Sequence, residues 1–230
     1  MSNQQIERIF GKRGLIVSCQ ALEDEPLHGG DAMAKMAKAA HQSGAIGIRT
    51  NGVADILAIK EAVDLPVIGL IKRNIPGSDV FITPTLDEVK AIIEAGAEIV
   101  ALDITDREDR LAQAALLIEY AHLAGAAVMA DVSTFEEGIA AEKLGADFIG
   151  TTLSGYTPYS TQLKGPDFDL IRRLSEAVQV PVVAEGRIWT PEEAAKALEA
   201  GATYVVVGSA ITRPQLITAR YVEAVQKVVG

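Results

Sequence analysis

The chain has 230 residues, of which 49% are hydrophobic and only 5% aromatic, so we expect a core of Ala, Val, Ile and Leu. Its formal net charge of −10 excludes proteins that wrap a nucleic-acid backbone, since those need clustered Lys and Arg. The single cysteine, Cys19, excludes an intrachain disulfide and indicates a reducing, cytoplasmic compartment, and neither a secretory signal nor an apolar run of membrane-spanning length is found.

Eight short apolar segments rich in β-branched residues recur in chain order, at residues 15–19, 46–49, 67–72, 99–103, 128–131, 148–151, 182–185 and 204–208. Most are unbroken apolar runs, as expected for parallel strands that are covered on both faces. The stretches between them are rich in Ala, Glu, Lys and Leu at helical spacing, for example residues 86–94 and 191–199. This alternation predicts an α/β protein with a parallel sheet.

The helix boundaries carry repeated local signals. A Gly-Ala pair stands where each of five helices should stop, at Gly44, Gly96, Gly125, Gly145 and Gly201. Three helices should open with a capping box, at Thr85 with Glu88, Thr134 with Glu137, and Thr190 with Glu193. Pro191 takes the favoured first helical position of the last of these helices.

Eight βα units in a chain of this length predict a single (β/α)8 TIM barrel over residues 1–230, with residues 1–13 as an N-terminal helical extension. The alternative is an open, doubly wound sheet. No glycine-rich dinucleotide fingerprint follows the first strand, and no shift in composition indicates a linker between two domains. We therefore favour one closed barrel.

Polar residues follow the predicted strands, where barrel enzymes place their active sites. Any one of them could be a structural cap or a solvated strand end. Together they predict an active site at the carboxyl ends of the strands. The polar ends are residues 18–20, 49–51, 72–74, 103, 131, 151–152, 185–187 and 208–209.

The loops after strands seven and eight have the features of a phosphate site, which barrels of this kind commonly build there. Gly186, Gly208 and Ser209 would let backbone amides approach phosphate oxygens closely, and a helix beginning near Pro214 would add its positive end. Arg213 can supply a charged fork. The alternative is an ordinary turn with a surface arginine.

Lys72 and Glu185 end strands three and seven, which lie opposite each other in a ring of eight. A lysine and a carboxylate that face each other across the mouth suit a substrate carbon held between a base and an acid. An ion pair that spans the barrel is the other interpretation, and the two are compatible. We also expect Thr152 and Arg187, at the ends of strands six and seven, to contact the substrate.

A metal site is not indicated. His41 and His122 fall on predicted helices, and His28, in the first loop, is the only histidine that could line the mouth. No His/Asp set at metal-ligand spacing is found. Cys19 is expected to be a small buried residue, because no histidine is placed to activate it as a nucleophile.

Seven segments of the chain carry specific motifs, at residues 16–22, 24–28, 69–74, 130–134, 151–160, 184–188 and 207–215. The most specific are the Ser-Gly-Tyr-Thr-Pro-Tyr loop at 154–159 and the Ile-Thr-Arg-Pro ending at 211–214. These segments closely resemble the bacterial N-acetylmannosamine-6-phosphate 2-epimerase family, and the resemblance covers nearly the whole chain.

This resemblance implies an enzyme of sialic-acid degradation that uses neither metal nor nucleotide cofactor. It places Lys72 at the catalytic lysine, and Glu185 at the second catalytic or lysine-orienting group. Its sugar-binding or N-acetyl-binding positions match Gln20, Arg49 and Asp131. The phosphate-binding positions match Gly186, Gly208, Ser209 and Arg213.

Inversion at C2 requires that a proton be removed from one face and returned on the other, after the ring opens to the aldehyde. Lys72 would remove the proton and Arg49 would stabilise the enolate oxygen. An ordinary lysine pKa of about 10.4 leaves little neutral amine, so burial or nearby arginine must lower it, or the lysine must act as the acid. Tyr156 and Tyr159 would either close over the sugar or pack against the loop.

Two rival functions stay open. Lys72 could form a Schiff base in a class I aldolase-like lyase that acts on a phosphorylated keto sugar. The barrel could also be a non-catalytic phosphosugar sensor. For partners, we expect a small phosphosugar, no nucleic acid and no membrane, and a homodimer is one option for the oligomeric state.

Overall fold

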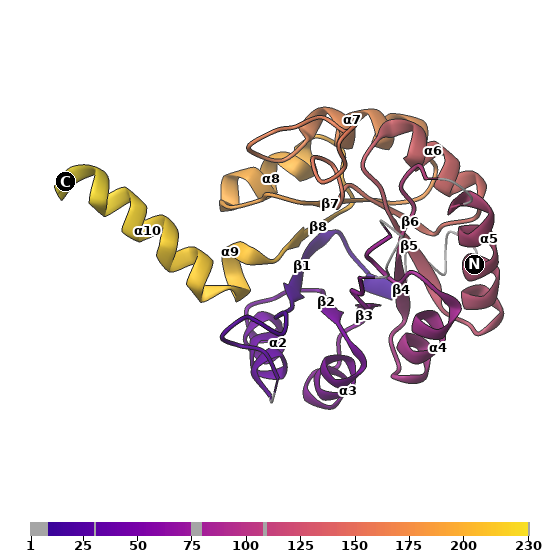
Figure 1. Ribbon diagram of the computed structural model, residues 1–230, viewed down its shortest axis with the longest axis horizontal. Coiled ribbons are helices and arrows are strands. Elements are labelled where there is room, and N and C mark those ends of the chain that lie inside the picture. The colour runs from indigo at the N-terminus through magenta and orange to yellow at the C-terminus, as the bar shows by residue number, and fades with distance from the viewer. Residues whose placement is uncertain (1–8, 30, 75–79, 108–109, 230) are drawn as a thin grey trace.

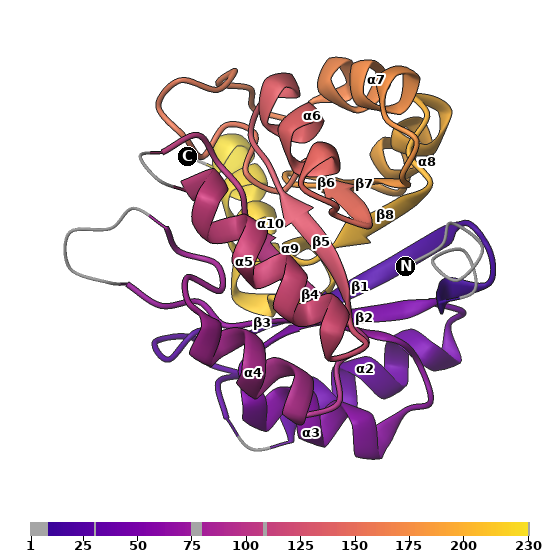
Figure 2. The same cartoon turned by 90° about the vertical axis from the view of Figure 1, so that its right-hand side faces the viewer.

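The computed structural model describes residues 9–29, 31–74, 80–107 and 110–229. Its eight strands are parallel and close into a barrel in chain order, β1 to β8, with β8 paired to β1 (Figures 1 and 2). The predicted TIM barrel is therefore confirmed. The strands are β1 (Gly14–Cys19), β2 (Gly47–Asn51), β3 (Val67–Leu70), β4 (Ile99–Asp103), β5 (Ala127–Asp131), β6 (Phe148–Gly150), β7 (Val182–Glu185) and β8 (Tyr204–Val207).

One helix follows each of the first seven strands, and these helices surround the barrel (Figure 2). They are α2 (Ala32–Gln42), α3 (Val53–Ala62), α4 (Leu86–Glu94), α5 (Arg110–Leu123), α6 (Phe135–Lys143), α7 (Phe168–Ala177) and α8 (Pro191–Glu199). Strand β8 is followed by the short α9 (Ser209–Thr212) and then by α10 (Pro214–Val229). Helix α10 extends away from the barrel (Figure 1), and none of its residues is buried.

Local sequence signals set the helix ends as predicted. Capping boxes open α4, α6 and α8, and the five glycines that follow α2, α4, α5, α6 and α8 all have positive φ. A left-handed backbone is what closes a helix at low cost when the residue is glycine. These signals therefore set both ends of α4, α6 and α8 and the carboxyl ends of α2 and α5.

Each strand has an inner and an outer apolar face. One buried cluster joins strand residues such as Val17 and Val205 to helix residues, and it forms the layer between strands and helices. A second cluster takes the alternate strand residues and includes no residue of α2–α10, so it fills the barrel interior. Phe10, Phe148 and Tyr204 belong to the second cluster, with ring centroids 4.8–6.1 Å apart. Because side chains alternate along a strand, this inner set determines which residues point into the barrel mouth.

The third strand is shorter than predicted. We expected it to run over residues 67–72, but β3 ends at Leu70, and Lys72 instead forms an isolated antiparallel bridge with Ile82. The Thr83 amide donates to the Ile71 carbonyl and the Arg73 amide to the Phe81 carbonyl. The chain therefore folds back on itself after β3, a long-range pairing that the local pattern could not reveal.

The predicted N-terminal extension lies largely outside the described residues, because 1–8 are not described. Ile9 and Phe10 are helical, and residues 11–13 form a bend before β1. Across the described ranges, no helix is long and apolar enough to cross a membrane.

Candidate active site

The inner face of each strand changes from apolar to polar at the carboxyl end of the barrel. The inward residues of β4 are Ile99 and Ala101, and Asp103 continues the same alternation. In the same way Met129 on β5 is followed by Asp131, and Val183 on β7 by Glu185. The site is thus the top layer of the barrel interior, where polar groups replace the apolar core.

A cavity of about 490 Å³ opens above this layer. Every predicted site residue except Asp131 lines it, and Asp131 lies fully buried beneath it. The predicted residues that line it are Gln20, Arg49, Lys72, Thr152, Glu185, Gly186, Arg187, Gly208, Ser209 and Arg213. The structure therefore brings together residues from the first loop to the last.

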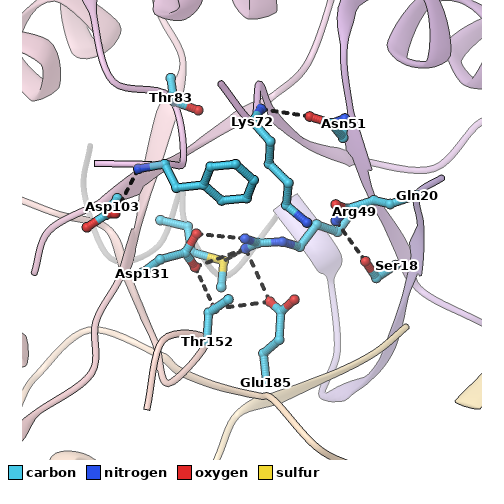
Figure 3. Close-up of polar contacts among 12 residues, drawn as sticks. Ser18, Gln20, Arg49, Asn51, Lys72, Thr83, Asp103, Asp131, Thr152 and Glu185 are labelled. Atoms are coloured by element: carbon cyan, nitrogen blue, oxygen red, sulfur yellow. Dashed lines mark hydrogen bonds and ion pairs between the residues drawn. The ribbon is translucent and has the colours of Figure 1, made fainter. Parts of the chain in front are cut away.

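Arg49 is the centre of a buried network at the floor of the cavity (Figure 3). Its two terminal nitrogens donate to the Asp131 carboxylate at 2.6 and 3.1 Å, and one of them lies 3.2 Å from Glu185 Oε2. The Thr152 hydroxyl donates to Asp131 at 2.6 Å and contacts Glu185 at 3.2 Å. The guanidinium is about 1% exposed, so its charge is held by paired carboxylates, as a buried charge requires. Within the part of the chain that the structure describes, its Nε has no hydrogen-bond partner, so it can donate to a ligand.

Lys72 combines a buried side chain with cationic neighbours. Burial, reinforced by Arg49 and Arg213, lowers the pKa of Lys72 from 10.5 to about 8. Its backbone amide donates to the Asn51 side chain at 2.8 Å, which fixes the start of the side chain beyond β3 (Figure 3). A lysine with this pKa supplies a useful fraction of neutral amine near neutral pH.

Glu185 faces the cavity from β7 with an unusually basic carboxylate. Burial raises its pKa from 4.5 to about 7, and Asp131 adds to this effect while Arg49 and Lys72 oppose it. Its ion-pair partner is Arg49, and no ion pair joins it to Lys72 within the part of the chain that the structure describes. The interpretation of a lysine–glutamate ion pair across the barrel is therefore not observed, although the two charges still influence each other's pKa.

The last two βα loops have the shape expected of an anion site. Gly186 has φ 111°, a left-handed conformation that favours glycine. A Cβ on Gly208 would lie 3.1 Å from Ser18 Cβ, so glycine is needed for close packing there. A short helix, α9, begins directly after Gly208, and α10 begins at Pro214, where the sequence predicted a helix start. Arg213 reaches the cavity from the end of α9 and is held by Glu25, with 3.1 Å between Nη2 and Oε2.

The guanidinium of Arg187 donates mainly to backbone carbonyls of the protein. Its guanidinium donates to the carbonyls of Ser154 and Gly165, both in the long loop after β6, and lies 5.5 Å from the Tyr156 ring. Its φ of 56° is left-handed for a non-glycine residue, a strained conformation that clusters at functional sites. Tyr156 lines the cavity, whereas the Tyr159 hydroxyl donates to Glu137 at 2.7 Å outside it.

The histidines and the cysteine lie away from this chemistry. His41 and His122 are on α2 and α5, and His122 contacts Asp147 at 2.8 Å. His28 is exposed in the first loop and is absent from the cavity lining. Cys19 is fully buried, and burial raises the pKa of its thiol to about 12. Among the described residues, no cluster of His, Cys, Asp or Glu could hold a metal ion.

Comparison with known proteins identifies the family. Residues 33–227 match the family described as "Putative N-acetylmannosamine-6-phosphate epimerase". The chain belongs to this family. Relatives with the corresponding 2-epimerase description include one from Caldanaerobacter subterraneus, 58% identical over 94% of this chain and 92% of the relative, and one from Clostridioides difficile, 50% identical over 96% and 99%.

A solved structure of a family member supports the same grouping. The N-acetylmannosamine-6-phosphate 2-epimerase from Clostridium perfringens is 51% identical, with a TM-score of 0.90 over 96% of each chain. More distant barrels, such as a deoxyribose phosphate aldolase from Aeropyrum pernix, share 17% identity at a TM-score of 0.67. That degree of likeness shows the common fold alone.

Several residues that line the cavity of this chain were not predicted from its sequence as site residues. Phe81 reaches it from the chain that folds back after β3, and Arg107 reaches it from the loop after β4. Trp189, the single tryptophan of the chain, reaches it from the loop after β7. A charged or aromatic residue soon after a strand end is a weak signal by itself. For Phe81 no local signal existed, because its place depends on the bridge between Lys72 and Ile82.

Proposed function

We propose that this chain is an N-acylglucosamine-6-phosphate 2-epimerase that interconverts N-acetylmannosamine 6-phosphate and N-acetylglucosamine 6-phosphate without a cofactor. The observation that carries the proposal is the placement of an amine and a carboxylic acid around one cavity, with pKa values of about 8 and about 7. Family membership supplies the substrate. The reaction belongs to the breakdown of sialic acid and amino sugars, in the cytoplasm.

In this mechanism the sugar ring first opens to the aldehyde, which makes the hydrogen on C2 acidic. Neutral Lys72 removes that proton, the C2–H bond breaks, and its electron pair moves into an enolate whose oxygen carries the charge. Arg49, with an unpaired Nε, stabilises that oxygen. Protonated Glu185 then delivers a proton to the other face of C2, and a new C–H bond forms. One further proton exchange between Lys72 and Glu185 restores the enzyme.

The phosphate is anchored at the opposite end of the substrate from the aldehyde. Gly186, Gly208, Ser209 and Arg213 all line the cavity, and they follow β7 and β8, which are neighbours in the barrel. Backbone amides and a guanidinium are the groups that bind phosphate in such loops. Fixing the anion there holds C2 in position between the base and the acid.

Proton NMR of the purified protein with N-acetylmannosamine 6-phosphate in heavy water tests this function. We expect N-acetylglucosamine 6-phosphate to form with deuterium at C2. Lys72→Met should lower the exchange rate by about 10²–10⁴-fold, the usual contribution of a general base. Normal turnover by Lys72→Met would overturn the catalytic role of this lysine.

The same preparation separates the rival functions. A Schiff-base lyase would be trapped covalently on Lys72 by borohydride, whereas epimerisation through an enolate leaves nothing to trap. A phosphosugar sensor would bind the substrate without exchange at C2. Either result would replace the epimerase proposal.

A further inference from the structure

Arg107 is a cavity-lining arginine with an unused donor. It follows β4 in the loop that leads to α5, and its side chain is 22% exposed. Its Nη2 lies 3.5 Å from the Asp103 carboxylate, but its Nη1 is buried and has no hydrogen-bond partner among the described residues. Buried donors are almost always paired, so an unpaired one at the wall of a ligand cavity points to an acceptor that the ligand supplies.

The guanidinium is held in place by a carboxylate that is itself fixed. Asp103 Oδ1 accepts from the Thr105 amide at 3.1 Å and from the Thr105 hydroxyl at 2.6 Å. Its Oδ2 accepts from the Phe81 amide at 3.3 Å. Asp103 is about 1% exposed and cannot turn away to release Arg107 to another position. The open Nη1 is therefore a preset feature of the cavity wall.

The position of Arg107 in the barrel decides which part of a ligand it can reach. Strand β4 lies opposite β8 in the ring of eight strands, and β8 carries Gly208 and Arg213 at its end. Arg49 lies on β2 and Lys72 follows β3, and these two strands stand between β1 and β4 in the ring. A sugar whose phosphate is anchored at β7 and β8 therefore directs its remote end, with the substituent on C2, towards Arg107.

The chemistry of the pair favours a neutral acceptor. Arg107 and Asp103 together carry no net charge, and the glycines among the described residues that line the cavity, Gly186 and Gly208, follow β7 and β8 on the other side. An amide carbonyl is a strong neutral acceptor, and a charged donor makes a stronger bond to it than a neutral donor does.

From this geometry, and resting on the proposed function, we infer that Arg107 binds the carbonyl oxygen of the N-acyl group on C2 and so selects acylated amino sugars. The residue acts in recognition. Arg49, Lys72 and Glu185 carry the proton transfer. Loss of Arg107 should therefore weaken binding of acylated sugars far more than binding of other phosphate esters.

Binding titrations with three probes test this inference. The probes are N-acetylglucosamine 6-phosphate, which the enzyme equilibrates with its epimer, glucose 6-phosphate, which has a hydroxyl on C2, and inorganic phosphate. Trp189 lines the cavity and is the only tryptophan, so its fluorescence can report binding. Arg107→Met should raise the Kd for the acylated sugar about tenfold or more, the value of one hydrogen bond to a charged group. The Kd values for the other two probes should change less than about twofold.

Arg213→Met is the matched control, since it removes a guanidinium from the phosphate side and should weaken all three probes. Arg107→Lys keeps the charge without the planar fork and should recover part of the lost affinity. Equal weakening of all three probes by Arg107→Met would place the phosphate at Arg107 and overturn the inference. Equal weakening of the two sugars would assign the contact to a hydroxyl, and no change in any would show that Arg107 does not touch the ligand.

These titrations do not depend on turnover, so they separate this inference from the proposed function. Absence of C2 exchange, with selective loss of acyl-sugar binding in Arg107→Met, would refute the epimerase and keep the contact. Normal epimerisation by the wild-type protein, with no selective loss of acyl-sugar binding in Arg107→Met, would support the epimerase and refute the Arg107 contact. Far-UV circular dichroism of each variant confirms that the barrel is intact.

Discussion

At the residue scale, the proposed chemistry depends on Lys72 and Glu185, whose charged forms are both disfavoured by their surroundings. Lys72 is buried beside Arg49 and Arg213, so its pKa falls to about 8. Glu185 is buried beside Asp131, so its pKa rises to about 7. The two values approach each other from opposite directions. A proton can then move between the two groups at neutral pH, which an exposed lysine and an exposed glutamate would not allow.

This pair predicts a bell-shaped dependence of kcat/KM on pH, with a maximum between about 7 and 8. Below that window the pair gains a second proton, so Lys72 is charged and cannot accept one. Above it the pair has lost both protons, so Glu185 has none to deliver. Initial rates of C2 exchange between pH 5.5 and 9.5 measure the profile.

Glu185→Gln provides the control, since it removes a carboxylate that raises the pKa of Lys72. The falling limb should disappear, and the rising limb should move to lower pH, in a slower enzyme. A falling limb that persists in this variant would show that another group delivers the proton.

At the element scale, the capping box of α6 does more than start a helix. Glu137 Oε2 accepts from the Ser133 and Thr134 amides, as a cap should. Its Oε1 accepts from the Asp106 amide and the Tyr159 hydroxyl, both at 2.7 Å. One carboxylate, about 3% exposed, thus joins the loops after β4, β5 and β6. Those loops carry the cavity residues Arg107 and Tyr156.

We expect Tyr159→Phe to raise KM several-fold with little change in kcat, because the loop after β6 loses one tie to Glu137 while the reacting groups are untouched. Glu137→Gln should also lower the free energy of unfolding by about 1–3 kcal/mol, since a buried acceptor is replaced by a donor. Steady-state kinetics and urea denaturation measure the two effects.

Glu193→Gln is the matched control for Glu137→Gln. Glu193 forms the same capping box on α8 and accepts from the Trp189 and Thr190 amides, and among the described residues it has no hydrogen bond to a second loop. Glu193→Gln should lower the free energy of unfolding by less than about 1 kcal/mol and leave KM near its original value. Equal effects of the two glutamine variants on KM and on the free energy of unfolding would show that Glu137 acts only as a helix cap.

The capping boxes also show which contacts of a helix can be predicted from the sequence and which cannot. Thr134 and Glu137 are three residues apart, so their pairing is encoded locally and could be predicted. The contacts of Glu137 with Asp106 and Tyr159 join residues 31 and 22 positions away, and no local pattern specifies them. For the same reason, the bridge between Lys72 and Ile82 after β3 and the position of Phe81 could not be predicted from a local pattern. By contrast, Asp131 and Glu185 could be assigned to the barrel mouth because each ends an apolar strand.

At the scale of the whole molecule, helices α2 to α8 of the described chain pack around the barrel, whereas the long last helix, α10, does not. Helix α10 touches the rest of the chain near its start, where Gln215 donates to Glu25 and the Arg220 guanidinium lies 4.3 Å from the Trp189 ring. Several of its apolar residues lie at helical spacing and are exposed. They include Tyr221, Val225 and Val228, which are 72%, 57% and 85% exposed. A continuous exposed apolar face of this kind marks an interaction surface.

We expect a second copy of the chain to cover this face, because each copy presents both an unpacked last helix and a barrel without its eighth helix. Sedimentation at micromolar concentration should give twice the 24.3 kDa of one chain. Val225→Glu puts a charge on the apolar face and should shift the protein towards monomer, whereas Gln226→Glu puts the same charge on the neighbouring polar position and should leave the dimer intact. A wild-type protein that sediments as a single chain at every concentration would mean that α10 serves another purpose, and the free apolar face would then need a different partner.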